Sequence, residues 1–246
     1  MSETSDESKP EGGTGRIAED GVFVVGTDTG VGKTVVTAGL TGWLREVGTA
    51  AVAVKPCQTG YPPDDDAEFV ESVCGTADAA VCLQRLSPPL APEVAAREAD
   101  DDVTLSYESI RDGVADVVAG SETAVVEGIG GLRVPLADDR EVIDLVADVG
   151  LPALVVARSG LGTLNHTALT VQALRRRGVP VVGVVLNEYE GEGATTAERT
   201  NPGVIERMTG CTVWPMPPLE IDSSASVIDG LRAHLPQSVL QQAIDQ

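Results

Sequence analysis

A glycine-rich segment between the first apolar run and the first helix-like segment is the strongest constraint on how this chain folds. Residues 26–34 read Gly-Thr-Asp-Thr-Gly-Val-Gly-Lys-Thr, directly after the apolar run 22–25. A strand that turns through glycines into a helix points backbone N–H groups and the positive end of the helix dipole into one concavity. The segment predicts a phosphate-binding loop, in which Lys33 reaches the β- and γ-phosphates and the Thr34 hydroxyl ligates Mg²⁺.

The spacing of this loop is unusual. Five residues separate Gly26 from Gly32, one more than the common pattern has, and Thr27 occupies the position expected for the first glycine. We interpret this departure as the mark of a particular family.

Short β-branched runs alternate with helical patterns from Gly21 onward, which predicts βαβ units around a parallel sheet. The expected strands are 22–25, 51–54, 124–126, 153–157, 181–186 and 212–214, and the expected helices are 33–47, 66–73, 106–119, 141–148, 164–177 and 202–209. Unbroken apolar strands suit a sheet covered on both faces. The predicted fold is therefore a three-layer α-β-α, P-loop NTPase type with a mostly parallel central sheet. The proline-containing segment 86–97 is expected to be a loop, either the wall or lid of a site or a passive connector.

The 246 residues are expected to form one domain over 21–246, preceded by an acidic tail over 1–20. The tail has too little apolar content to offset the entropy of ordering, which predicts disorder. No apolar run approaches the roughly 20 residues that span a bilayer, and the N-terminus is acidic where a secretory signal is basic. We expect a soluble, cytoplasmic protein. Its four scattered cysteines, without a Cys-x-x-Cys pair, indicate neither a zinc site nor a disulfide framework.

The formal net charge of −21 argues against nucleic-acid and anionic-membrane partners, because both would be repelled. Lysine is almost absent: apart from Lys9 the chain has only Lys33 and Lys55, which favours a chemical role for both over a solvated strand-end charge. An acidic, lysine-poor surface is typical of a protein that works in high salt, where screening relieves self-repulsion. We therefore expect a halophilic host.

Polar segments follow two further expected strands. Lys55, with Thr59 beyond it, follows 51–54, and Glu127 opens the run Glu-Gly-Ile-Gly-Gly after 124–126. Because ligands of open α/β sheets gather outside the carboxyl ends of the strands, we expect these side chains near the phosphate loop. Glu127 suits Mg²⁺ directly or through water, and the acidic run Asp64-Asp65-Asp66 could supply another ligand. A capping role for Glu127 and solvated surface for the acidic run are the alternatives.

A second glycine-rich turn, 158–166, reads Arg-Ser-Gly-Leu-Gly-Thr-Leu-Asn-His and opens a helix. Its free N–H groups could bind a carboxylate by the logic of the phosphate loop. A plain helix cap by Thr163 or Asn165, with a structural His166, is the alternative reading.

Taken together, these segments resemble one family closely. The resemblance runs in consistent order over about residues 21–219 and is carried by 26–34, Lys55-Pro56 with Thr59, Asp66-Ala67, 89–96, 127–131, 160–167 and Asn187. They are similar to dethiobiotin synthetase, the ATP-dependent enzyme that closes the ureido ring in biotin synthesis. The unusual spacing of the first loop and the Leu-Gly-Thr-Leu-Asn-His stretch are the most specific parts.

The resemblance implies that 7,8-diaminopelargonate, CO₂ and MgATP give dethiobiotin, ADP and phosphate through a carbamate and a carbamic-phosphoric anhydride. It implies catalytic roles for Lys55, Lys33 and Thr27, and Mg²⁺ ligation by Thr34, Asp66 and Glu127. The implied ATP-binding residues are Thr29, Gly30, Val31, Gly32, Lys33, Thr34, Asp66, Glu127, Gly128, Ile129, Gly130, Asn187, Glu188, Pro217, Pro218 and Leu219.

The implied substrate contacts are Thr27, Lys55, Thr59 and Gly130, joined by Gly162, Thr163, Leu164 and Asn165 of the neighbouring subunit. This implies a homodimer with shared active sites. Two alternatives share the core fold: an amidoligase of the cobyrinate diamide synthase type and a partitioning or septum-positioning ATPase switch. Too little sequence follows Leu219 for the glutaminase domain usual in the first, and the loop lacks the extra lysine usual in the second.

Overall fold

The computed structural model describes residues 20–99, 103–221 and 223–244. The expected acidic tail lies almost wholly outside these ranges, so its disorder and the extent of one domain over 21–246 stay predictions. Within the described ranges, none of the helices combines the length and the apolar character needed to cross a membrane.

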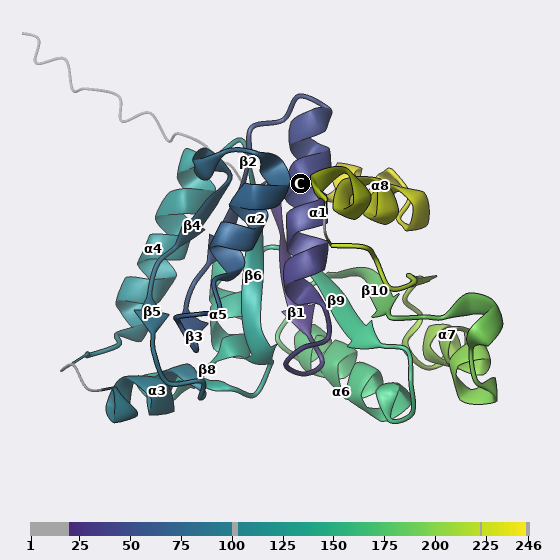
Figure 1. The fold of residues 1–246 in the computed structure, drawn as a ribbon. Helices are drawn as coiled ribbons and strands as arrows, with labels where there is room; N and C mark the ends of the chain where they lie inside the picture. Colours follow the sequence, from purple (N-terminus) through teal and green to yellow (C-terminus); the bar gives the residue numbers. More distant parts are fainter. Residues whose placement is uncertain (1–19, 100–102, 222, 245–246) are drawn as a thin grey trace, which may run out of the picture.

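Seven strands form the central sheet, and every strand pair in it is parallel. The spatial order is β11-β10-β9-β1-β6-β2-β4 (Figure 1). The strands are β1 (Gly21–Gly26), β2 (Ala51–Lys55), β4 (Ala80–Cys82), β6 (Thr123–Gly131), β9 (Ala153–Arg158), β10 (Val181–Asn187) and β11 (Val213–Pro215). This confirms the predicted fold class.

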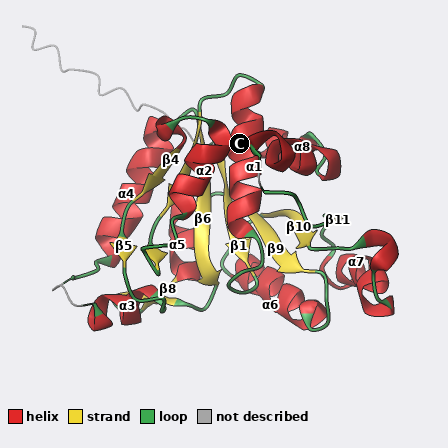
Figure 2. Ribbon diagram, viewed as in Figure 1, coloured by secondary structure: helices red, strands yellow, loops and turns green. Residues whose placement is uncertain are grey.

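Helices cover both faces of the sheet, as the yellow strands between red helices in Figure 2 show. One core cluster joins the sheet to α1 (Lys33–Glu46), α2 (Asp66–Cys74), α8 (Ser224–His234) and α9 (Ser238–Ile244). The other joins it to α3 (Pro92–Glu98), α4 (Tyr107–Gly120), α5 (Val142–Val149), α6 (Thr163–Arg176) and α7 (Thr196–Thr209). Both sheet faces are thus buried, which explains why the strands are apolar without alternation.

Short elements complete the chain outside the central sheet. A parallel pair joins β3 (Gln58–Thr59) to β5 (Arg85–Leu86), and an antiparallel pair joins β7 (Pro135–Ala137) to β8 (Arg140–Glu141). Two 3₁₀ turns, η1 (Ala77–Ala79) and η2 (Gly191–Gly193), lie in connecting segments. Strand β3 lies in the segment that directly follows Lys55, the last residue of β2.

Two predictions of local structure are wrong. Residues 86–97 are not a continuous loop, since α3 starts at Pro92; proline is favoured in the first helical turn, where its missing N–H has no intrahelical partner to lose. The helix expected at 202–209 starts earlier, at Thr196, because Thr195 and Glu198 form a reciprocal capping box. Strand β4 was not predicted, and β6 continues past Val126 through Glu127 to Gly131.

The sheet order places the phosphate loop at its centre. Strand β1 lies between β6 and β9, so the chain winds outward in both directions from it. In such doubly wound sheets, ligands bind at this switch point outside the carboxyl ends of the strands. The ends of β1, β2, β6, β9 and β10 therefore form one edge, at which the predicted site residues can be located.

Candidate active site

The phosphate loop joins the end of β1 to the start of α1. Gly30 and Gly32 have left-handed φ values of 67° and 97°, and Gly32 is the N-cap of α1 without any side-chain cap. Lys33 is buried and its Nζ donates to the Asp28 carbonyl at 3.0 Å, so the side chain folds back along the loop. A Cβ on Gly26 would lie 2.8 Å from that Nζ. Glycine at position 26 therefore makes room for the lysine.

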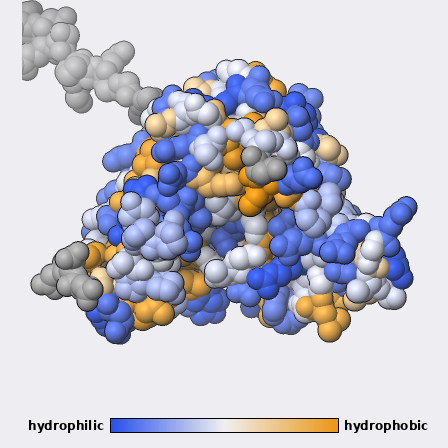
Figure 3. All heavy atoms as spheres, in the orientation of Figure 1, coloured by the Kyte–Doolittle hydropathy of each residue, from blue (hydrophilic) through white to orange (hydrophobic). Residues whose placement is uncertain are grey.

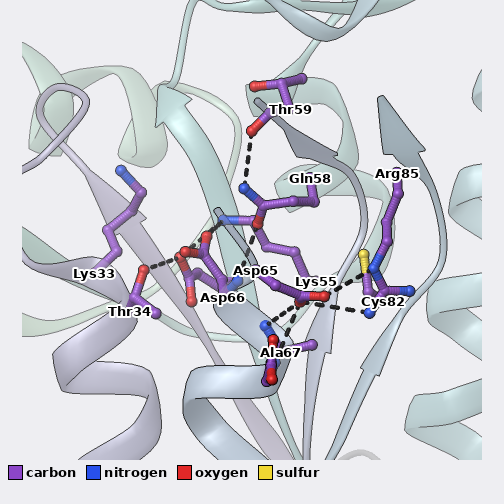
Figure 4. A network of polar contacts seen from close by, with 12 residues as sticks. Lys33, Thr34, Lys55, Gln58, Thr59, Asp65, Asp66, Ala67, Cys82 and Arg85 are labelled. Atoms are coloured by element: carbon purple, nitrogen blue, oxygen red, sulfur yellow. Dashed lines mark hydrogen bonds and ion pairs between the residues drawn. The ribbon is translucent and has the colours of Figure 1, made fainter. Parts of the chain in front are cut away.

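Lys55, Asp66 and Thr34 gather in one polar cluster beside the loop (Figure 4). Glu127 joins this cluster through contacts with Lys55 and Thr34. The Lys55 Nζ lies 2.8 Å from Glu127 Oε1 and forms a second ion pair with Asp66 Oδ2. The Thr34 hydroxyl donates to the same Glu127 oxygen at 2.9 Å. The topology thus brings together residues separated by up to 93 positions along the chain, as predicted from the strand ends.

Burial and charge act against each other in this cluster. Burial alone would lower the pKa of Lys55, but the carboxylates of Glu127 and Asp66 outweigh it and raise that pKa above its ordinary value. Burial also favours a neutral Asp66, yet the Lys55 charge holds the pKa of this carboxyl below its usual range. Burial raises the pKa of Glu127. The ammonium of Lys55 therefore stays charged inside the protein.

The pKa of Lys33 shifts in the opposite direction to that of Lys55. Burial, reinforced by the positive charge of Lys55, lowers the pKa of Lys33 to about 8. The site therefore holds its second cation at an electrostatic cost, which an incoming phosphate would relieve. This is the electrostatic behaviour expected of an anion-binding site.

The cluster consists of two carboxylates and a hydroxyl around the Lys55 ammonium. Carboxylate and hydroxyl oxygens are the hard donors that Mg²⁺ prefers, and it usually keeps water and substrate phosphates among its ligands. Asp66, Glu127 and the Thr34 hydroxyl are such hard oxygen donors, gathered beside the phosphate loop. Within the described residues, no group of three or more His, Cys, Asp or Glu side chains is arranged to hold a metal by itself.

The glycine run at the end of β6 packs against the phosphate loop. The register between β1 and β6 shifts between Val24 and Gly26, so that Gly26 pairs with Gly131. A Cβ on Gly130, at φ 56°, would lie 3.3 Å from Thr29 Oγ1. Glycines thus let this strand approach the loop closely, on the side where Thr27 is half-buried.

These features agree with what comparison with known proteins finds. A family model described as an AAA domain matches residues 20–224. The ATP-dependent dethiobiotin synthetase of Haloferax mediterranei is 59% identical over 91% of this chain and 94% of its own length. This chain belongs to the ATP-dependent dethiobiotin synthetase family. Relatives of the same name from Anaeromyxobacter sp. strain Fw109-5 and Bacillus licheniformis are 45% and 35% identical, over 77% and 89% of this chain and 86% and 95% of their own.

Solved structures show a likeness in fold. The septum site-determining protein MinD of Pyrococcus horikoshii, complexed with Mg-ADP, aligns with a TM-score of 0.55 and 16% identity over 92% of this chain and 96% of its own. A ParA family ATPase from Chlorobium tepidum aligns with a TM-score of 0.56 and 14% identity over 94% and 98%. At these identities the likeness concerns architecture alone, and the sequence relatives favour the dethiobiotin synthetase family over the switch and amidoligase alternatives.

Asn187, at the end of β10, lies against the phosphate loop. Its Nδ2 donates to the Val31 carbonyl at 3.1 Å, and a Cβ on Gly32 would lie 2.1 Å from that nitrogen. Glu188 follows it in a left-handed conformation and is exposed. Pro217–Leu219 follow β11, which pairs with β10. The residues that the dethiobiotin synthetase family implies for adenine thus lie at the sheet edge that carries the loop.

The second glycine-rich turn stands apart from the polar cluster. Gly162 is the N-cap of α6 in a left-handed conformation, and no side-chain cap is present, so the alternative reading of a cap by Thr163 or Asn165 is not supported. Thr163 instead lies 3.1 Å from the Thr167 hydroxyl. No hydrogen bond or ion pair among the described residues joins the turn to Lys33, Lys55 or Glu127. Leu161 is 95% exposed.

Sequence reasoning missed two polar side chains at the site. Gln58 is buried, and its amide lies between Thr59 and Asp66. Arg158, at the end of β9, reaches back to the phosphate loop and donates to the Thr29 carbonyl at 3.2 Å. Both residues follow an expected strand, and this position could have indicated that they lie near the site. Their residue types gave no such indication.

Proposed function

We propose that this chain closes the ureido ring of dethiobiotin, using 7,8-diaminopelargonate, CO₂ and ATP and releasing ADP and phosphate. Besides family membership, the observation that supports this most is the pairing of two buried lysines beside a phosphate loop. Lys33 lies on the loop, and Lys55 is held charged by two carboxylates next to it. A reaction with an anionic carbamate and a transferring phosphoryl group needs cations at two such neighbouring positions.

In the proposed reaction, one amine of the substrate attacks CO₂ and loses a proton, giving a carbamate. A carbamate oxygen then attacks the γ-phosphorus and ADP leaves. The second amine attacks the carbonyl carbon of the resulting anhydride, phosphate departs, and the ring closes. Lys33 stabilises charge on the transferring phosphoryl group and Lys55 stabilises the carbamate, while Thr27 and Thr59 orient the diamine and Gly130 leaves room for it.

We propose that Thr34, Asp66 and Glu127 hold Mg²⁺ together with the nucleotide phosphates. The ion would neutralise charge on the β- and γ-phosphates during transfer. The remaining loop residues Thr29 to Gly32, with Gly128 and Ile129, border the phosphates through their backbone. Asn187 already uses its Nδ2 on Val31, so its Oδ1 is the atom expected to face the adenine amino group, with Glu188 and Pro217–Leu219 nearby.

The direct test combines the protein with diaminopelargonate, bicarbonate and MgATP in high salt, followed by mass detection of dethiobiotin. Product that depends on all three substrates is expected. ATP hydrolysis without the diamine, and no product, would instead favour the ATPase switch.

We also propose a homodimer whose sites are shared, the turn Gly162–Asn165 binding the carboxylate of the partner's substrate. The uncapped N-terminus of α6 offers N–H groups for this task. Two apolar side chains are exposed here, Leu161 just before α6 and Leu169 on it, and an orange patch appears over α6 in Figure 3. A groove of about 470 Å³ is lined by Leu169 together with Asn165 and Met208. A second copy of the chain would cover this surface.

Mixing two inactive variants tests the shared site. Lys33→Ala and Asn165→Ala damage different components, so a hybrid dimer keeps one intact site of two. Random exchange makes half of the dimers hybrid, and about a quarter of wild-type activity should return. Confirmed subunit exchange without any return of activity would rule out sharing.

The cytoplasm of a halophile is our proposed setting, since the net charge of −21 disfavours folding unless salt screens it. The midpoint of thermal unfolding should therefore rise between dilute buffer and molar KCl. Equal midpoints would count against this proposal.

A further inference from the structure

Gln58 is a buried polar residue between two parts of the proposed site. Its side chain starts in β3, three positions beyond Lys55, and the residue is only 5% exposed. The Nε2 donates to the Thr59 carbonyl at 2.9 Å, and the Oε1 accepts from the Asp66 backbone N–H at 3.2 Å. Both ends of the amide are thus occupied (Figure 4).

The two partners of Gln58 carry different proposed tasks. Asp66 is the first residue of α2, where backbone N–H groups have no partner inside the helix, and its carboxylate pairs with Lys55. Thr59 belongs to the segment proposed to contact the diamine. The side-chain amide of Gln58 therefore links the start of α2, which carries the Asp66 carboxylate, to the backbone of Thr59.

The start of α2 has a second attachment, through the Asp65 side chain. Asp65 caps the helix by accepting from the N–H groups of Ala67 and Glu68, at 3.1 and 3.2 Å. Arg85, opposite Gln58 in the β3–β5 register, donates its Nε to Asp65 at 3.0 Å. This contact steadies the same helix start without touching Asp66 or Thr59, so Arg85 offers a matched control.

We propose that Gln58 is a positioning residue, which aligns the Asp66 carboxylate with Lys55 and Glu127 and holds Thr59 at the substrate side. The proposal rests on the function proposed above. Residues that orient metal ligands typically change metal affinity or activity by about 10- to 100-fold when they are replaced. An effect near the lower end is expected here, because Lys55 also holds Asp66 in place.

The test is ATP binding by calorimetry across a Mg²⁺ titration, in the full chain without diamine. Gln58→Met has a similar volume and lacks both hydrogen bonds. We expect its half-saturating Mg²⁺ concentration to rise about tenfold, while ATP binding without Mg²⁺ stays within about twofold of wild type. In the ring-closure assay the KM for the diamine should rise as well. Arg85→Gln should leave the Mg²⁺ dependence unchanged.

A purely structural role would reduce the active fraction and kcat without moving the Mg²⁺ dependence, and that result in folded Gln58→Met would overturn the proposal. An equal shift in Arg85→Gln would overturn it too. Should Gln58→Met fail to fold, Gln58→Asn replaces it with the same expectation, since its amide is one methylene too short to reach both partners. Because ATP binding is measured without diamine, the test of Gln58 does not depend on ring closure. A wild-type protein that fails to close the ring would contradict the proposed function but not the role of Gln58 in Mg²⁺ binding.

Discussion

The turns before α1 and α6 share their backbone design. Each ends in a left-handed glycine N-cap, with φ 97° at Gly32 and 94° at Gly162, and each opens a helix of 14 residues without a side-chain cap. Their surroundings differ. Ten residues of α1 are buried, but only five residues of α6 are. Lys33, at the turn before α1, is buried, whereas Leu161, in the turn before α6, is exposed to solvent.

The difference shows what converts an anion-binding turn into a reaction site. Free N–H groups and a helix dipole are present in both turns, and they suffice to attract a negative group. Two buried cations, Lys33 and Lys55, lie at or beside the first turn, together with the carboxylates that keep Lys55 charged. The second turn has an exposed apolar surface instead. We therefore propose that the second turn only binds the substrate, and that the reaction takes place at the first turn.

The largest effect should follow from removing the cation that distinguishes the first turn. Lys55→Ala is expected to lower the ring-closure rate by about 10³-fold, because transition-state charge loses its stabiliser. ATP binding should change little, since Lys33 and the loop backbone remain. Rapid-quench turnover and calorimetry measure the two quantities separately. Arg97→Ala, which removes an exposed cation on α3, is the control.

A Lys55→Ala protein that turned over near the normal rate would place the chemistry elsewhere. Equal losses of ATP binding and turnover would mean that Lys55 acts on the nucleotide alone. Either result would remove the distinction between the two turns.

Equivalent substitutions at the two N-cap glycines compare the turns directly. Both glycines are left-handed, so alanine costs about 1 kcal/mol of backbone strain at each. At Gly32 the new Cβ would also meet Asn187, which cannot move without losing its bond to Val31, whereas at Gly162 the nearest atom is 3.9 Å away. Gly32→Ala should lose about 2 to 3 kcal/mol of unfolding free energy and Gly162→Ala about 1 kcal/mol.

Urea denaturation measures these unfolding free energies, and calorimetry measures the affinity of each variant for ATP. ATP binding should be lost in Gly32→Ala and kept in Gly162→Ala, whose KM for the diamine should rise. Similar penalties at both positions would show that strain alone, and not the packing of Asn187, distinguishes them.

The parts of this molecule that follow from local pattern could be predicted. The phosphate loop is a contiguous motif, and apolar runs mark the strands whose carboxyl ends carry Lys55 and Glu127. Since parallel strands end at one edge, their convergence followed from the fold class alone.

What escaped prediction depends on contacts between distant segments or on competing local rules. Gln58 looks like any polar residue after a strand, and its role depends on where α2 begins. The prolines before α3 suggest a loop, yet Pro92 stands where proline favours a helix start.

A smaller effect is expected from the loss of stability that the buried charge of Lys33 causes in the folded protein. The pKa of Lys33 is about 8 when folded and 10.5 ordinarily, so the unfolded chain binds more protons between these values. Stability should therefore rise as pH rises from about 8 to 10.5, and below pH 8 the penalty is fully present. Lys33→Met should remove this rise and stabilise the free protein at pH 7 by about 2 kcal/mol, about 3 from the charge less about 1 for the lost bond to Asp28.

Denaturant unfolding of wild type and Lys33→Met across pH 7 to 10.5 measures this linkage. Asn165→Ala, at the exposed start of α6, is the control and should keep the wild-type pH profile. A Lys33→Met protein less stable than wild type at pH 7 would mean that Lys33 is not held at a cost.

The smallest effect should come from Arg158, which begins the second turn and reaches back to the first. Its guanidinium donates to the Thr29 and Gly30 carbonyls at 3.2 and 3.4 Å, but it is exposed, and long bonds in water contribute little. Arg158→Gln should therefore weaken ATP binding by no more than about threefold and leave the unfolding midpoint within about one degree. A loss above tenfold would mean that Arg158 contacts the nucleotide itself, in which case the second turn would contribute a cation to the chemistry of the first.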